Sequence, residues 1–127
     1  MLKNVRKIYQ CGKCGNLVDL MENTGITVTC CGEPMTELIP NTVDASKEKH
    51  VPSVAADGNK LKVVVGEVPH PMTKEHHITW IIVAEGNRTT RVVLPETGPP
   101  EEEFYIGAGP ITVYAFCNLH GLWAVDL

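Results

Sequence analysis

The sequence has no long apolar run, and this absence excludes a membrane-spanning helix. Its most apolar stretch, residues 78–84, has seven residues, whereas a helix needs about 20 to cross a bilayer. A cleavable signal peptide is not expected either, because the basic start, residues 1–7, leads to Cys11 without an apolar segment. We therefore expect a cytoplasmic protein.

Clusters of basic residues are also lacking. The net charge is -4, no basic run is longer than a pair, and aromatic residues do not alternate with basic ones. Surfaces that bind nucleic acid carry such clusters, so neither a nucleic acid nor a membrane is expected as a partner. In an acidic protein, an anionic substrate would need local positive charge to attract it.

Helical periodicity is the third absence. No segment repeats apolar residues every 3.6 positions, and nine prolines and eleven glycines are spread along the chain, which argues against long helices. Short runs rich in Val, Ile, Thr and aromatic residues instead predict strands, at residues 5–9, 17–20, 26–29, 61–68, 78–83, 89–94, 111–117 and 122–125. This spacing predicts an all-β protein containing an antiparallel sandwich.

Two other segments are expected to lack strands. Residues 99–103, two prolines followed by three glutamates, are predicted to form a solvated acidic loop. Residues 38–48 are predicted to link a domain at 1–38 to a second domain at 39–127. The first domain is too short to bury a core, and domains below about 40 residues usually need a metal, disulfides or oligomerisation.

Four cysteines meet that need in the first domain: Cys11, Cys14, Cys30 and Cys31. Residues 17–20 and 26–29 are expected to pair as a hairpin that returns the second cysteine pair to the first. Thiolates that hold a metal suit a reducing compartment better than disulfides do. Adjacent cysteines are unusual ligands, because neighbouring strand residues point to opposite faces; they favour iron over an ordinary zinc ribbon. Two disulfides or a structural zinc remain alternatives.

The second domain contains the fifth cysteine and all the histidines: His50, His70, His76, His77, Cys117 and His120. Cys117 and His120 follow a predicted strand, so they can meet across a turn at one end of the sandwich. Four imidazole nitrogens and a thiolate opposite an empty position would make a ferrous centre that gives one electron to a small oxygen species, and the thiolate would supply electron density.

The motifs also occur in a recognisable order. They are Cys11-x-x-Cys14 with Cys30-Cys31, Glu48-Lys49-His50, His70-Pro71-Met72 with Glu75-His76, and Cys117-Asn118-Leu119-His120-Gly121. Over its whole length the chain resembles the desulfoferrodoxins, which are two-iron superoxide reductases. The resemblance implies a desulforedoxin-like domain with iron on Cys11, Cys14, Cys30 and Cys31, and an immunoglobulin-like sandwich with iron on His50, His70, His76, His120 and Cys117. It does not imply His77 as a ligand.

The resemblance further implies the reaction and its partners. Superoxide is expected to take one electron and leave as hydrogen peroxide without oxygen release, using electrons from a rubredoxin-type donor in a homodimer. Lys49 would attract superoxide and help to deliver a proton. Glu48 would occupy the sixth position of ferric iron and displace peroxide.

Three other functional interpretations are compatible with these residues. A sandwich with Cys-x-x-His near its end also describes blue-copper proteins, although those normally add a methionine that residues 122–124 lack. A zinc-stabilised binding module with incidental histidines is the second alternative. A superoxide dismutase is the third, and ligand types cannot separate it from a reductase.

Overall fold

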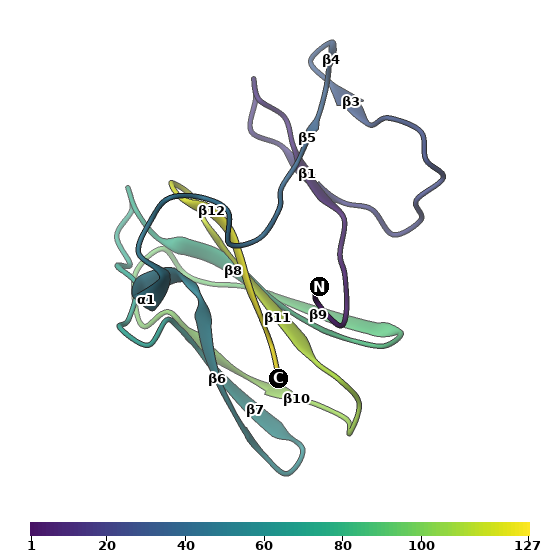
Figure 1. Cartoon of the computed structure of the whole chain (residues 1–127). Helices are drawn as coiled ribbons and strands as arrows, with labels where there is room; N and C mark the ends of the chain where they lie inside the picture. Colours follow the sequence, from purple (N-terminus) through teal and green to yellow (C-terminus); the bar gives the residue numbers. More distant parts are fainter. The chain divides into compact units, whose positions relative to one another are not determined.

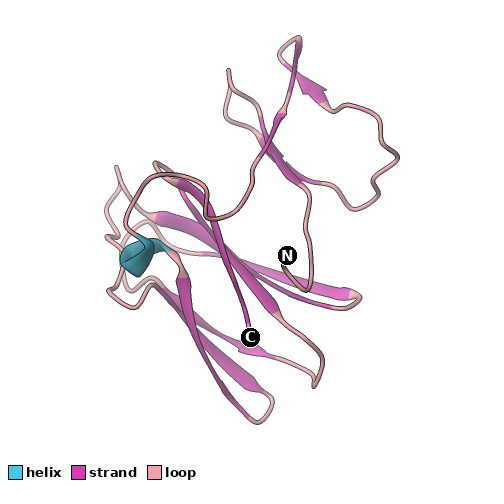
Figure 2. Cartoon of the chain, in the orientation of Figure 1, coloured by secondary structure: helices cyan, strands magenta, loops and turns pink.

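The computed structural model describes residues 1–127, which form two compact units. The small unit is Val5–Ile39, and the large unit combines Met1–Asn4 with Pro40–Leu127. Strands dominate both units, and α1 (Lys47–His50) is a single helical turn (Figure 2). The all-β prediction is confirmed. No helix has the length and apolar character needed to cross a membrane.

The small unit is built from five short strands: β1 (Ile8–Gln10), β2 (Leu17–Asp19), β3 (Thr29–Cys30), β4 (Glu33–Pro34) and β5 (Thr36–Glu37). β1 lies between β2 and β5, and β3 pairs only with β4. The predicted hairpin between residues 17–20 and 26–29 is therefore wrong. The turn after β1 is closed by bonds from the Cys11 amide to the Asn16 carbonyl (2.9 Å) and from the Gly15 amide to the Cys11 carbonyl (3.0 Å), so β1 becomes the partner of β2.

The large unit is a two-layer sandwich (Figure 1). One sheet has the order β10-β7-β6, from Glu101–Tyr105, Lys60–Val65 and Pro52–Asp57. The other has the order β12-β11-β8-β9, from Gly121–Asp126, Thr112–Cys117, Ile78–Glu85 and Arg88–Val93. All pairings are antiparallel, as the immunoglobulin-like prediction required. The core contains Leu61, Val63, Val65, Ile78, Ile81, Val83, Phe104, Val113, Ala115 and Cys117.

The acidic segment is a strand and not the predicted loop. Glu101–Tyr105 pairs with β7, its Phe104 is buried in the core, and the Lys62 ammonium forms an ion pair with the Glu101 carboxylate. Because β10 is an edge strand, its glutamates also oppose pairing with another chain. The strand β6 was not predicted at all.

A register shift in the four-stranded sheet interrupts the alternation of side chains between the two faces of β8. Ile78, Trp80 and Ile82 are all buried. They do not share one environment, however, because Ile78 belongs to the core whereas Trp80 stacks on Phe116. The pairing with β11 is irregular between Phe116 and Cys117, so the strand end that carries Cys117 departs from the regular ladder.

Two asparagines fasten chain segments to the four-stranded sheet. The Asn4 amide donates to the Thr112 hydroxyl (2.9 Å), and the Tyr114 hydroxyl donates to the Asn4 carbonyl (2.7 Å). The Asn41 side chain donates to the Ala124 carbonyl (3.0 Å) and accepts from the Ala124 amide (2.9 Å). The bonds of Asn4 explain why Met1–Asn4 belongs to the large unit although it precedes the small one.

Candidate metal centres

The first cysteine pair lies in the turn between β1 and β2. The amides of Lys13 and Cys14 both donate to the Cys11 sulfur at 3.4 Å. These bonds, that from Cys14 first, lower the pKa of the Cys11 thiol to about 6 because they stabilise the thiolate. The turn therefore presents an ionised sulfur before any metal is bound.

The second pair lies at the hairpin of β3 and β4, where Cys30 ends β3 and Cys31 begins the two-residue turn. Cys31 has φ 53° and Gly32 has φ 75°, as a primed hairpin turn requires. Adjacent residues of a strand point to opposite faces, but the left-handed backbone of Cys31 takes it out of the strand. Its side chain therefore no longer points away from that of Cys30. The Cys30 sulfur lies 3.6 Å from that of Cys14 and 4.0 Å from that of Cys31.

The four thiols are grouped closely enough to hold one metal ion. Their sulfurs lie within 4.8 Å of one another, and none is in a disulfide. Hydrogen bonds shared with Cys14 and Cys11 raise the pKa of Cys31 to about 12, and the same two partners raise that of Cys30. Without a metal the cluster thus keeps protons on these sulfurs, whereas a bound cation would let all four ionise. The donor set fits the predicted iron site.

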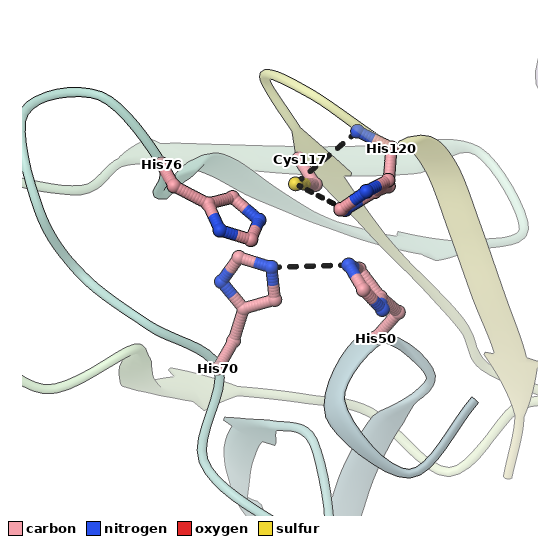
Figure 3. A group of neighbouring side chains, drawn as sticks. All are labelled: His50, His70, His76, Cys117 and His120. Carbon is pink, nitrogen blue, oxygen red and sulfur yellow. Dashed lines mark hydrogen bonds between the residues drawn. The ribbon is translucent and has the colours of Figure 1, made fainter. Parts of the chain in front are cut away.

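The second group gathers ligands from separate parts of the sandwich. His50 ends α1, His70 lies in the loop after β7, His76 precedes β8, Cys117 ends β11, and His120 lies in the turn before β12. The five side chains converge (Figure 3), and their ligand atoms lie within 4.8 Å of one another. His50 and His70 are each 3% exposed and Cys117 is fully buried.

Hydrogen bonds fix the tautomers of two imidazoles. His50 Nδ1 lies 2.6 Å from the Ser46 carbonyl oxygen, and His70 Nδ1 lies 2.7 Å from that of Pro71. A carbonyl only accepts, so each Nδ1 donates and each Nε2 carries a lone pair. These two Nε2 atoms are 3.1 Å apart (Figure 3). Two lone pairs at that distance repel each other unless a cation lies beside them.

A third lone pair supports the same conclusion. His76 Nε2 is buried and has no hydrogen-bond partner, which is costly for a polar atom. Burial is also the main cause that lowers the pKa of His50 and His76 and brings that of His70 to about 4. These three imidazoles are therefore neutral near pH 7, the form that binds metals.

Cys117 and His120 complete the set. The His120 amide donates to the Cys117 sulfur (3.4 Å), and His120 Nδ1 lies 3.9 Å from that sulfur. His120 thus turns Nδ1 toward the group, whereas His50 and His70 offer Nε2. Burial raises the pKa of the Cys117 thiol, so a metal must displace its proton. Four nitrogens and one sulfur fit iron with one position left for a small molecule.

Asn118 joins the two loops that carry His76 and Cys117. Its side chain accepts from the His77 amide (2.9 Å) and donates to the Glu75 carbonyl (2.9 Å), so it holds the backbone on both sides of His76. His77 itself is outside the ligand group, and its Nδ1 lies 2.9 Å from the Thr73 carbonyl oxygen. Nothing in the composition distinguished Asn118; only its place between ligands pointed to it.

Gly66 sets the position of α1. A Cβ atom at this residue would lie 2.6 Å from the Glu48 carbonyl oxygen and 2.8 Å from that of Val51, both closer than real contacts allow. The helical turn that carries His50 thus packs directly on the Gly66 backbone. This role could not be predicted from the sequence, because only the fold brings residues 48 and 66 together.

Glu48 and Lys49 are both exposed and form no ion pair. After burial and the neighbouring histidines, the Lys49 ammonium contributes to the lowered pKa of His50 and His76, so its charge is felt inside the ligand group. Glu48 lies outside that group and lines a shallow depression with Pro52 and Glu67.

Comparison with known proteins agrees with this geometry. The family described as desulfoferrodoxin matches residues 42–126, and the desulfoferrodoxin N-terminal domain matches residues 3–38. The desulfoferrodoxin of Clostridium acetobutylicum is 42% identical over 127 residues, which cover 99% of this chain and 100% of that protein.

Solved structures extend the likeness to the fold. The superoxide reductase from Treponema pallidum has a TM-score of 0.77 and 35% identity, covering 95% of this chain and 98% of that one. A one-iron superoxide reductase from Giardia intestinalis has a TM-score of 0.55 and 31% identity, covering 64% of this chain and 98% of its own. With both family domains matched and both ligand sets assembled, the chain belongs to the desulfoferrodoxin family.

Proposed function

We propose that this protein is a superoxide reductase that converts superoxide to hydrogen peroxide with one electron and two protons. The observation that carries the proposal is the convergence of four imidazoles and one buried thiol on one point. Iron(II) bound there would supply the electron. The ligand set also argues against the blue-copper alternative, because such sites use two histidines and not four.

Each ligand has a defined task in this proposal. His50 and His70 donate through Nδ1 to backbone carbonyls, which fixes their rings and directs Nε2 to the metal. Cys117 supplies electron density to the metal, and the amide of His120 stabilises the negative charge on the Cys117 sulfur by donating a hydrogen bond to it. His76 offers an Nε2 atom that has no other partner. The nine predicted ligands are accordingly our proposed metal-binding residues.

Lys49 is proposed to attract the substrate and to help in delivering a proton. It is the exposed cation beside His50, its charge reaches the ligand group, and the protein as a whole is acidic. Superoxide is an anion, so a positive charge at the entrance raises the encounter rate. Glu48 is proposed to replace peroxide when the product leaves, which would require its side chain to move from the depression it now lines.

The rest of the proposal concerns the setting. We propose a rubredoxin-type protein as electron donor, a homodimer as the assembly, and functional domains at residues 1–38 and 39–127. A reducing compartment such as the cytoplasm is supported by five cysteines that form no disulfide.

The central experiment uses protein purified without oxygen. Its iron content is measured, and one pulse of superoxide is followed for peroxide and oxygen. A reductase yields peroxide and no oxygen while a thiolate-to-iron band appears. Oxygen released in step with peroxide would identify a dismutase, and protein that contains zinc but no iron would reject the proposal.

A second experiment tests Lys49. Lys49→Ala should slow the second-order reaction with superoxide about ten-fold at low salt and less at high salt, because steering by charge is screened. Lys60→Ala removes an equal charge at the exposed start of β7 and serves as the matched control. Equal rates for the two variants would remove Lys49 from the mechanism.

A further inference from the structure

Trp123 contacts two ligands that are far apart in the sequence. It lies in β12 and is completely buried. The pairing of Ala115 with Trp123 and of Cys117 with Gly121 places the tryptophan on the same face of the sheet as Cys117. An indole at this position therefore points into the end of the sandwich where the ligands gather.

The indole covers one face of the His50 ring. The ring centroids are 4.9 Å apart with an angle of 26° between the planes, a stacked arrangement. The same imidazole is held at one edge by the bond from Nδ1 to the Ser46 carbonyl. With a face and an edge both fixed, the ring cannot rotate without breaking one of these contacts.

The indole nitrogen acts on the other ligand. Trp123 Nε1 donates to the carbonyl oxygen of His120 at 3.0 Å. This carbonyl lies in the turn that ends at Gly121, whose φ is +78°, and the amide of His120 in turn donates to the Cys117 sulfur. The tryptophan thus closes the turn whose geometry sets where His120 and Cys117 point.

We propose that Trp123 is a positioning residue that holds His50 and His120 in the orientation in which they bind the metal. The inference rests on the metal site of the proposed function and not on the reaction with superoxide. Groups that support metal ligands commonly contribute about 10- to 100-fold to metal affinity. Trp123 supports a ligand from α1 and one from the β11–β12 turn with a single side chain.

The test compares Trp123→Phe with Trp80→Phe. The first change removes the N–H donor and shrinks the stacked ring; the second alters a buried tryptophan that stacks on Phe116. A chelator is added to the oxidised iron protein, and the bleaching of the thiolate-to-iron band is timed. Trp123→Phe should bleach about ten-fold faster and shift the band, while Trp80→Phe stays within about two-fold of the parent. Equal rates and unshifted bands would overturn the proposal.

A second measurement applies even if Trp123→Phe does not fold. The chain has two tryptophans, so in Trp80→Phe protein the indole N–H resonance belongs to Trp123 alone. Zn(II), which is diamagnetic, should shift this resonance, and its hydrogen exchange should be slow. An indole that exchanges freely, or that does not respond to Zn(II), contradicts the inference. Protein that passes both tests but does not reduce superoxide would reject the proposed function and leave this inference standing.

Discussion

The two metal sites differ in how much of the chain is needed to build them. The four cysteines lie in or directly beside two tight turns within 21 residues, and Cys14 and Cys31 are exposed. The five ligands of the sandwich are drawn from residues 50 to 120, and His50, His70 and Cys117 are buried. The first site is local and needs its metal to hold the turns, whereas the second is prepared by a fold with its own core.

The largest expected effect comes from removing both metals, which should unfold the small unit and leave the sandwich folded. The small unit buries only Ile8, Cys11 and Met35, too little to offset the entropy of folding. Its amide protons should lose their protection against exchange, while those of β8 and β11 keep theirs. Hydrogen exchange on metal-free protein at pH 7 measures this, and reloading metal is the control. Protection of β1 and β2 without metal would show that the comparison is wrong.

Acid should weaken the metal-free sandwich by a moderate amount. His70 has a pKa of about 4 in the folded chain against an ordinary 6.5, so between these values the unfolded chain binds the proton that the folded chain excludes. Stability is therefore complete above pH 6.5 and falls as the pH drops toward 4. From pH 7 to 4.5 the loss should be about 2 to 3 kcal/mol from this residue.

Urea unfolding followed by tryptophan fluorescence measures this loss, because both tryptophans lie in the sandwich. His70→Gln should reduce the dependence on pH. His77→Gln replaces a histidine outside the ligand group and serves as the matched control. If the free energy of unfolding did not change between pH 7 and 4.5, water and protons would have free access to the metal-free site.

The smallest expected effect concerns Asn118. Asn118→Ala and Asn41→Ala each remove two side-chain hydrogen bonds to backbone. Asn118→Ala should lower the free energy of unfolding by about 1 kcal/mol. Asn41→Ala should lower it by more, because Asn41 has φ +66°, a conformation that alanine adopts less readily. Only Asn118→Ala should also speed the loss of iron to a chelator, because only Asn118 holds the backbone around His76. The same rate of iron loss in both variants would assign Asn118 a role in stability alone.

The sequence predicted the ligands better than the pairing of strands. Thiols and imidazoles are rare and chemically distinctive, so all nine proposed ligands stood out, and the structure brings them into the two expected groups. Strand partners depend on contacts distant in the chain. The turn at Cys11 brings β2 beside β1, so these two strands pair. Residues 101–105 form a strand because Phe104 is buried in the core, although the glutamates of this segment predicted a loop.

Residues that support the ligands were harder to find. Trp123 could have been suggested only with the pairing of β11 and β12 in hand, because that pairing places it on the same face as Cys117. The stacking of Trp123 on His50 could not be predicted, because only the folded sandwich brings α1 next to β12. Asn118 stood in a recognised motif without a role, and its hydrogen bonds to Glu75 and His77 emerged only from the structure.

Gly66 carries a consequence for how the protein tolerates mutation. Any side chain there meets the carbonyls of Glu48 and Val51, and relief would shift the segment that carries Lys49 and His50. A random mutational screen for lost activity would therefore recover position 66 alongside the ligands, although it binds neither metal nor substrate. In such a screen, positions that do not tolerate substitution would include residues that support the backbone of the ligands as well as the ligands themselves.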